Sequence, residues 1–173
     1  MKRLFTILFV LITCAAFSQK TVEIYNFSSH NFDFRLETKP LAAGINYPTL
    51  NTGNTLYTLT PAVGYVIYTN STTTGIPYYS PLSIPFITGW FRKNSGTAAD
   101  IPISNTTAQS AFQNSQQWNI IKFSFAGIPF SGTGYFNATG SSFNYYSPSS
   151  GTTTYFDVYD LGSGSYQVFI DEF

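Results

Sequence analysis

The chain has one cysteine in 173 residues, and it lies close to the start. Cys14 sits within an apolar run that extends from Leu4 to Phe17. The remainder of the chain therefore has no cysteine, which excludes a disulfide framework, a thiolate nucleophile and a cysteine metal site there. The single histidine, His30, cannot build a typical zinc site without cysteine partners. We therefore expect no metal site.

Charged residues are also scarce and make up 9% of the chain. Beyond Ser18 there are six basic and eight acidic side chains, which gives a formal net charge of −2. Nonspecific binding of nucleic acid requires a basic face that releases counterions, so we expect no nucleic-acid partner. Aromatic residues make up 18% of the chain, which contradicts the low hydrophobicity of disordered chains.

The first eighteen residues have the three-part layout of a secretory signal peptide. Two basic residues open the segment, an apolar run follows, and small residues occupy the −3 and −1 positions of a cut after Ser18. We expect residues 1–18 to be cleaved and residues 19–173, beginning at Gln19, to form a single secreted domain in the periplasm or outside the cell. Lipidation of Cys14 is the alternative, but Thr13 stands where a lipidation site wants Gly, Ala or Ser.

Short runs of alternating apolar and polar residues recur along the chain, and helical periodicity is almost absent. In the clearest run, residues 31–37, Phe32, Phe34 and Leu36 alternate with three charged residues. Because side chains alternate between the two faces of a strand, this run is a half-buried strand. We expect it to form a hairpin with a strand at residues 21–27.

These patterns predict an all-β fold. We expect a single antiparallel β-sandwich, immunoglobulin-like or jelly-roll-like, with about eight to ten short strands. At most one short helix is expected, near Ala108, where Ala111 and Phe112 follow at helical spacing and Asn105 or Thr106 caps the start. The predicted core consists of the inward positions of the strands: Val22, Ile24, Phe32, Phe34, Leu36, Ile121, Phe123, Phe125, Phe156, Val158, Val168 and Ile170.

The last two predicted strands flank a Gly-Ser-Gly turn at residues 162–164. A two-residue loop would pair Tyr159 with Tyr166 and would mix polar and apolar residues on both faces. A three-residue loop pairs Asp160 with Tyr166 and gathers the apolar residues on one face. Register follows the hydrophobic pattern, so we predict the three-residue loop.

This hairpin also contains the motif L-x-x-G-x-Y-x-V-x-I, formed by Leu161, Gly164, Tyr166, Val168 and Ile170. The motif resembles the closing hairpin of many secreted immunoglobulin-like sandwiches and of the sorting domain of the type 9 secretion system. A sorting domain continues past this hairpin into a basic strand, whereas this chain has Asp171-Glu172-Phe173. The resemblance covers about ten residues and identifies no family.

The chain lacks the residues of common catalytic sites. His30 lies in an expected loop, and no serine has the G-x-S-x-G surroundings of a nucleophile elbow. A glycosidase with two carboxylates is the least implausible enzyme, because it needs only one pair of Asp or Glu side chains. Most of the carboxylates occupy alternating positions on the solvated faces of strands. We therefore predict a non-catalytic protein with no cofactor.

Several aromatic residues are adjacent in the sequence. Two neighbours in a strand point to opposite faces, so both rings cannot enter one core. We expect Phe136 and Phe156 to point inward. Tyr135 and Tyr155 should point outward, because a phenol hydroxyl can then reach water.

The predicted register places two phenol rings, a phenyl ring, a carboxylate and an amide together on the outer face of the last hairpin. Sugar sites use this mixture of flat rings and polar groups. We therefore predict a secreted module that binds ligands or surfaces, with a glycan or a cell-surface component as its partner. The alternatives are an ordinary surface partly covered by the loop at Tyr78-Tyr79, a self-associating structural subunit, and a small outer-membrane barrel. The predicted binding residues are Tyr155, Asp157, Tyr159, Gln167 and Phe169.

Overall fold

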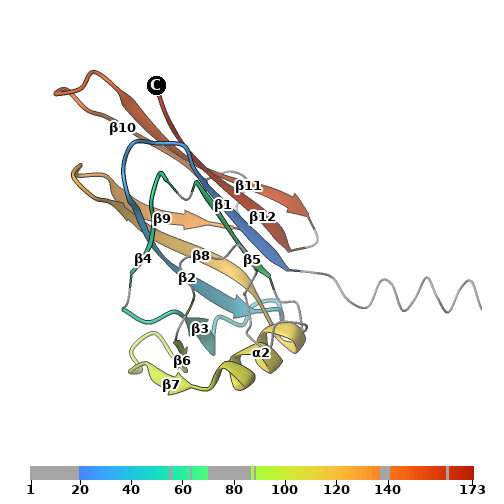
Figure 1. Ribbon diagram of the computed structural model, residues 1–173. Helices are drawn as coiled ribbons and strands as arrows, with labels where there is room; N and C mark the ends of the chain where they lie inside the picture. The colour runs from blue at the N-terminus through green and yellow to red at the C-terminus, as the bar shows by residue number, and fades with distance from the viewer. Residues whose placement is uncertain are drawn as a thin grey trace, which may run out of the picture.

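The described part of the computed structural model shows two β-sheets packed face to face, with one helix at one end (Figure 1). The predicted all-β sandwich is confirmed, with twelve strands among the described residues where about eight to ten were expected. All pairings among the described strands are antiparallel except that of the first strand with the last. The described residues are 20–54, 56–62, 64–69, 87, 89–136, 141–162 and 164–173.

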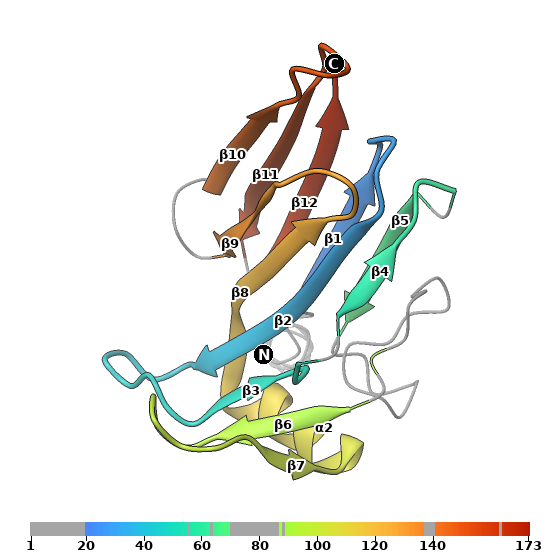
Figure 2. The ribbon, with the colours of Figure 1, turned by 90° about the vertical axis from the view of Figure 1, so that its left-hand side faces the viewer.

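Five strands form sheet A and seven form sheet B. Strands β3, β6 and β7 and the helix gather at one end, and the chain ends at the opposite end (Figure 2). In spatial order, sheet A contains β10 (Ser141–Tyr146), β11 (Thr153–Gly162), β12 (Ser165–Glu172), β1 (Thr21–Asn26) and β5 (Tyr65–Thr69). Sheet B contains β7 (Ile101–Ile103), β6 (Trp90–Lys93), β3 (Thr49–Asn51), β2 (Phe32–Pro40), β8 (Gln116–Phe125) and β9 (Ser131–Tyr135), and β4 (Tyr57–Leu59) also pairs with β2.

The core lies between the sheets, and all twelve predicted core residues are buried. The rings of Phe123 in sheet B and Phe156 in sheet A stack with centroids 4.0 Å apart. Phe136 is also buried, and Tyr135 keeps 47% of its surface exposed, as the adjacent aromatic residues predicted. Alternation alone therefore identified the inward face of these strands.

The prediction that residues 21–27 and 31–37 form a hairpin is wrong. Strand β1 lies in sheet A between β12 and β5, whereas β2 lies in sheet B beside β8. The chain crosses between the sheets because the buried side chain of Asn26 holds the turn: its Nδ2 donates to the carbonyl of His30 at 2.9 Å and its Oδ1 accepts from Ser28 Oγ at 2.7 Å. Each strand can then face its apolar side into the core from a different sheet.

The predicted register of the last hairpin is confirmed. Asp160 pairs with Tyr166, and Tyr159 pairs with Gln167. The predicted three-residue loop is wrong: Gly162 pairs with Ser165, which leaves two residues between the strands, and the ladder is irregular between Asp160 and Gly162. Bulges of this kind are common where a glycine adopts a positive φ, and φ is +82° at Gly162.

The predicted helix is α2 (Asn105–Asn114), and it buries Ala108 and Phe112. Its N-cap is Ser104 rather than Asn105 or Thr106, because the Ser104 hydroxyl accepts from the N–H of Thr107 at 3.1 Å. Its last turn is held by Lys20, which is buried and donates from Nζ to the carbonyl of Phe112 at 2.7 Å. A cation at this end also complements the helix dipole.

Two three-residue strands, β3 and β7, were not predicted from the sequence. Both are too short to show an alternating pattern, and β7 contains Pro102. The loop at Tyr78-Tyr79, which was considered as a cover for outward tyrosines, lies outside the described residues.

Candidate functional site

The five predicted binding residues share the outer face of β11 and β12. Tyr155, Asp157 and Tyr159 alternate with buried residues along β11, as Gln167 and Phe169 do along β12. Asp157 lies opposite Phe169, and Tyr159 lies opposite Gln167. Tyr159 is 51% exposed, and the other four are half-buried. The structure therefore brings the predicted set together on one surface.

Strands β1 and β5 extend this surface with two tyrosines that the sequence analysis missed. Tyr25 pairs with Phe169 across the parallel β1–β12 ladder, and Tyr65 pairs with Tyr25 across β1 and β5. Their rings stack, with centroids 5.0 Å apart for Tyr25 and Phe169 and 5.8 Å apart for Tyr25 and Tyr65. Tyr159 meets Phe169 edge-on at 5.6 Å. We call the four side chains Tyr159, Phe169, Tyr25 and Tyr65 the aromatic row.

The ends of the aromatic row differ from its middle. The near-parallel rings of Phe169 and Tyr25, with centroids 5.0 Å apart, form an offset stack in which each shields part of the other. Tyr65 at one end is 37% exposed, and Tyr159 at the other end is 51% exposed. Within the row, the most exposed rings are therefore those at the two ends, Tyr159 and Tyr65.

Polar groups lie beside the row and fix its geometry. Glu23 accepts hydrogen bonds at its Oε2 from the hydroxyl of Tyr25 at 2.9 Å and from Nε2 of Gln167 at 2.8 Å. Burial and the hydrogen bond to Glu23 raise the pKa of Tyr25, so its hydroxyl stays protonated as a donor. The carboxylate of Asp157, next to Tyr159 on β11, has no side-chain hydrogen bond within the described part of the chain. It can therefore accept hydrogen bonds from a ligand.

Three exposed aromatic side chains lie at the end of sheet A at which β12 finishes. Phe173 is 80% exposed, Phe27 is 61% exposed and Tyr146 is 59% exposed. Phe173 contacts Tyr155 edge-on with centroids 6.0 Å apart. We call Phe27, Tyr146 and Phe173 the end patch. Phe27 also stacks on Tyr25 and Phe169, with centroids 6.0 and 6.4 Å apart, so the end patch adjoins the aromatic row.

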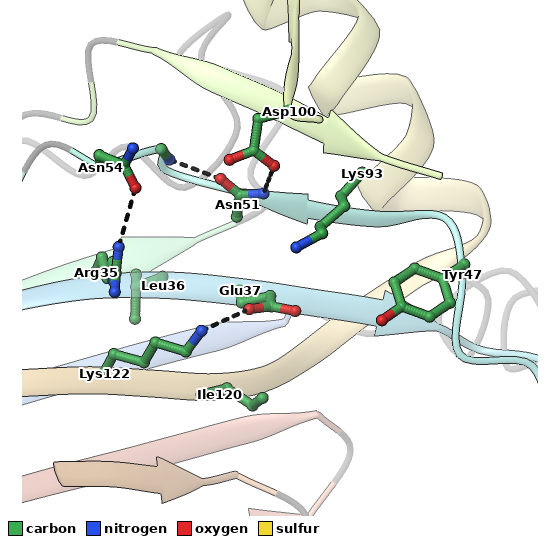
Figure 3. A pocket seen from close by; sticks show the side chains of 11 residues that line it. Arg35, Leu36, Glu37, Tyr47, Asn51, Asn54, Lys93, Asp100, Ile120 and Lys122 are labelled. Atoms are coloured by element: carbon green, nitrogen blue, oxygen red, sulfur yellow. Dashed lines mark hydrogen bonds and ion pairs between the residues drawn. The ribbon is translucent and has the colours of Figure 1, made fainter. Parts of the chain in front are cut away.

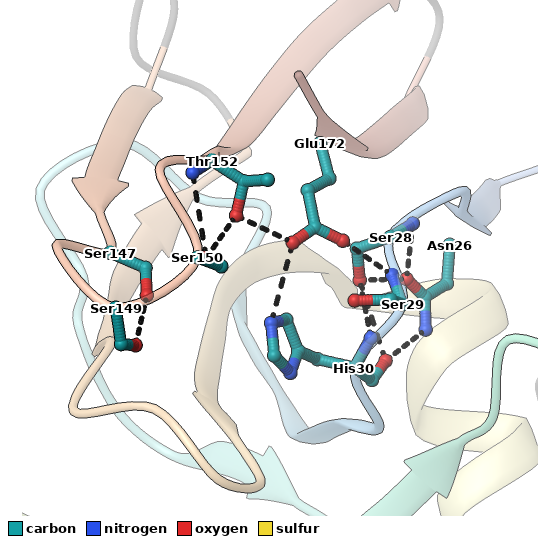
Figure 4. A network of polar contacts seen from close by, with 9 residues as sticks. All are labelled: Asn26, Ser28, Ser29, His30, Ser147, Ser149, Ser150, Thr152 and Glu172. Atoms are coloured by element: carbon teal, nitrogen blue, oxygen red, sulfur yellow. Dashed lines mark hydrogen bonds and ion pairs between the residues drawn. The ribbon is translucent and has the colours of Figure 1, made fainter.

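His30 and Glu172 form a polar network at the same end (Figure 4). The Glu172 carboxylate accepts from the N–H of Ser29 at 2.8 Å and from Thr152 Oγ1 at 3.0 Å, and it lies 3.5 Å from Nε2 of His30. Ser28 Oγ bonds to the backbone of His30 rather than to the imidazole ring. These contacts tie the β1–β2 turn to the β10–β11 loop and the end of β12. The described residues therefore contain no Ser-His-acid triad here.

Hydrogen bonds from Ser29 lower the pKa of Glu172, and the nearby imidazole of His30 adds to the effect. The carboxylate is thus ionised and fully occupied by its partners. A general acid needs a raised pKa, whereas the pKa of Glu172 is lowered. The network holds the β1–β2 turn and the β10–β11 loop together.

The comparisons with known proteins identify no relative. No protein-family model, no curated protein and no solved structure matches the chain. Within the described residues, no group of three or more His, Cys, Asp or Glu side chains could hold a metal ion. No helix in the same part of the chain has the length and hydropathy needed to cross a membrane.

Proposed function

We propose that the protein is a non-catalytic secreted module that binds glycans through the outer face of sheet A. One observation carries the proposal: an exposed phenol ring, Tyr159, lies beside the unpaired carboxylate of Asp157 and the oriented amide of Gln167. Sugars present both apolar C–H faces and hydroxyl groups, and sites that bind them combine flat rings with a few polar groups. Secretion is inferred from residues 1–18, which lie outside the described residues.

The arrangement suggests how a sugar would bind. The ring of Tyr159 stacks on a C–H face, and the Asp157 carboxylate accepts hydrogen bonds from hydroxyl groups. Gln167 is held by Glu23 at 2.8 Å, so the amide is oriented before the ligand arrives. Positions fixed by a sheet require little ordering on binding, which favours affinity. Tyr65, at the far end of the aromatic row, provides a second exposed ring for a longer chain.

The test is the double variant Tyr155→Ala with Tyr159→Ala on a glycan array and in cell-surface binding. We expect binding to be lost and the free energy of unfolding to change by no more than about 1 kcal/mol in total, because neither ring belongs to the core. Tyr135→Ala is the matched control, since Tyr135 is 47% exposed but lies on β9 of the other sheet.

Asp157→Asn separates stacking from recognition of hydroxyl groups. The amide retains one acceptor oxygen but loses the charge, so binding should weaken without being abolished. Unchanged binding in the double variant would exclude this face as the site. Unfolding of the double variant would show that the rings support the core instead.

A second candidate function is a structural subunit that self-associates through the end patch. The observation that favours it is the exposure of Phe27, Tyr146 and Phe173 at one end of sheet A, since clustered exposed apolar surface often marks an interface. Light scattering over a range of protein concentrations tests this. Growth in mass with concentration that is removed by Phe27→Ser with Phe173→Ser would favour the subunit, and a constant monomer mass would exclude it.

A further inference from the structure

The outer face of sheet B, on the other side of the sandwich from the aromatic row, contains a hollow of about 290 Å³ (Figure 3). Strands β2, β3 and β8 line it, together with Lys93 of β6 and Asp100 just before β7. Its volume is close to the lower limit of small-molecule sites, which is roughly 300 Å³. A ligand the size of one sugar residue fits within this volume. We call it the sheet B hollow.

The sheet B hollow concentrates positive charge in a chain that has little. Of the six basic side chains beyond Ser18, three line it: Arg35, Lys93 and Lys122. Arg35 and Lys122 lie directly opposite each other on β2 and β8. Like charges in this cross-strand position destabilise a sheet. Residues that break such a rule often serve function rather than stability.

The carboxylates in the hollow do not neutralise all three cations. Glu37 lies 3.6 Å from Lys122 and is its ion-pair partner. Asp100 accepts instead from the neutral amide of Asn51 at 3.0 Å. Arg35 donates to the neutral Asn54 at 3.3 Å. Among the described residues, Arg35 has no carboxylate partner.

Lys93 likewise has no carboxylate partner in the described part of the chain. Figure 3 shows its side chain reaching from β6 toward the space between Asn51 and Glu37. Two cations on facing sides of the hollow, Arg35 and Lys93, are therefore available to an anion. A guanidinium group can bind a carboxylate through two parallel hydrogen bonds, and an ammonium group adds a point charge.

We propose that the sheet B hollow binds an acidic sugar residue through its carboxylate. Arg35 and Lys93 bind the carboxylate, and the anion relieves the repulsion between Arg35 and Lys122. Glu37 and Asp100 accept hydrogen bonds from the sugar hydroxyls, and the Asn51 amide, beside Asp100, is a further hydroxyl partner. This site is independent of the aromatic row and does not rest on the function proposed for it.

The two carboxylates make the site selective. A small anion without hydroxyl groups, such as inorganic sulfate, would meet the repulsion of Glu37 and Asp100 without offering them hydrogen-bond donors. A neutral sugar would offer the donors but would leave Arg35 and Lys93 without a counterion. Only a ligand that combines an anion with hydroxyl groups satisfies both sets of side chains.

The test is calorimetric titration of the secreted protein with three probes: a galacturonic acid trimer, a galactose trimer and inorganic sulfate. We expect the acidic trimer to bind at least about tenfold more tightly than the other two, with an affinity that falls as salt is raised. Arg35→Gln and Lys93→Gln should each weaken its binding by about tenfold or more. Arg92→Gln is the matched control, because Arg92 adjoins Lys93 on β6, carries the same charge and does not line the hollow.

A measurement without ligand supports the same test. Arg35→Gln removes the repulsion with Lys122 and should leave the melting temperature unchanged or slightly raised, which separates lost binding from lost folding. The double variant Tyr155→Ala with Tyr159→Ala should bind the acidic trimer as the wild type does, so failure of one site is distinguishable from failure of the other. Equal binding of acidic and neutral trimers, equal effects of Lys93→Gln and Arg92→Gln, or no binding of the acidic trimer would overturn the proposal.

Discussion

The side-chain amide of Asn26 in β1 donates a hydrogen bond of 3.0 Å to the backbone carbonyl of Leu59 in β4, and this bond joins sheet A to sheet B. The second N–H of the amide reaches the carbonyl of His30, and Oδ1 accepts from both the N–H and the hydroxyl of Ser28. Both donors and both acceptor positions of the amide are therefore used. Asn26 is 1% exposed, so no water can replace these partners.

Replacing Asn26 by alanine should lower the free energy of unfolding by about 2–4 kcal/mol, because several buried polar groups lose their partner at once. Denaturation by urea measures the change. Asn144→Ala is the control, since Asn144 is exposed on β10 and should change stability by less than about 0.5 kcal/mol. Equal effects of the two substitutions would mean that the sheets are held together without this amide.

Gly134 in β9 leaves room for the core rings. A Cβ atom at this position would lie 2.9 Å from Cε1 of Phe156 and 3.1 Å from Cγ2 of Ile121. Gly134→Ala should therefore destabilise the protein by about 1–3 kcal/mol, the usual cost of overpacking a core. Gly89→Ala is the control, because its Cβ would meet only Phe91 at an ordinary 3.7 Å. Thermal unfolding of both variants shows whether the rings can move aside without cost.

Glu172 should make stability depend on pH in the acid range. Hydrogen bonds from Ser29 hold its pKa below the ordinary value of 4.5, so the unfolded chain binds more protons as the pH falls. The contribution of Glu172 is therefore complete above pH 4.5 and is lost as the pH falls through the folded-state pKa. Glu172→Gln should cost about 1 kcal/mol at neutral pH, because charged acceptors are replaced by a neutral one.

The difference between Glu172→Gln and the wild type should shrink toward zero in acid, as both side chains become neutral. Urea unfolding of both proteins across pH 2–7 checks this by comparing their difference in free energy of unfolding at pH 7 with the difference at pH 2. The neighbouring Asp171→Asn is the comparison, because Asp171 has no side-chain hydrogen bond among the described residues. A constant difference at all pH values would contradict the assigned role of Ser29.

Buried tyrosines should limit stability in alkali. Burial raises the pKa of Tyr68 and Tyr166, and burial with the Glu23 hydrogen bond raises that of Tyr25, above the ordinary 10.0. Stability is therefore independent of these groups below pH 10.0 and falls above it, since the unfolded chain loses its phenol protons first. Tyr68→Phe should reduce the loss of stability in alkali, as measured by urea denaturation above and below that pH.

The sequence analysis predicted the faces of the strands but not all of their partners. Alternation in β2 identified Phe32, Phe34 and Leu36 as core, and the apolar pattern fixed the register of the last hairpin. Alternation carries no information about which strand lies alongside, so the pairing of β1 was predicted wrongly. The hydrogen bonds of Asn26 at the end of β1 favour its place in sheet A over pairing with β2, the next strand in sequence.

The residues of the candidate sites also fall into those that a local sequence pattern could place and those that depend on distant pairings. The five residues of the last hairpin belong to one local unit, so the sequence alone could place them on one face. Tyr25 joins Phe169 only through the parallel β1–β12 ladder, which no local pattern predicts. Arg35 and Lys122 were recognisable only as charges on solvated faces, and their opposition depends on the pairing of β2 with β8.

The parallel ladder between β1 and β12 also constrains the order in which the protein can fold. Glu23 and Gln167, which face each other in this ladder, are 144 residues apart in the chain. Pairings between such distant segments form slowly, because the long loop must close before any contact is gained. During synthesis, β1 has no partner on this side until the last hairpin has been made. Sheet A therefore cannot be completed until β12, Ser165–Glu172, has been synthesised.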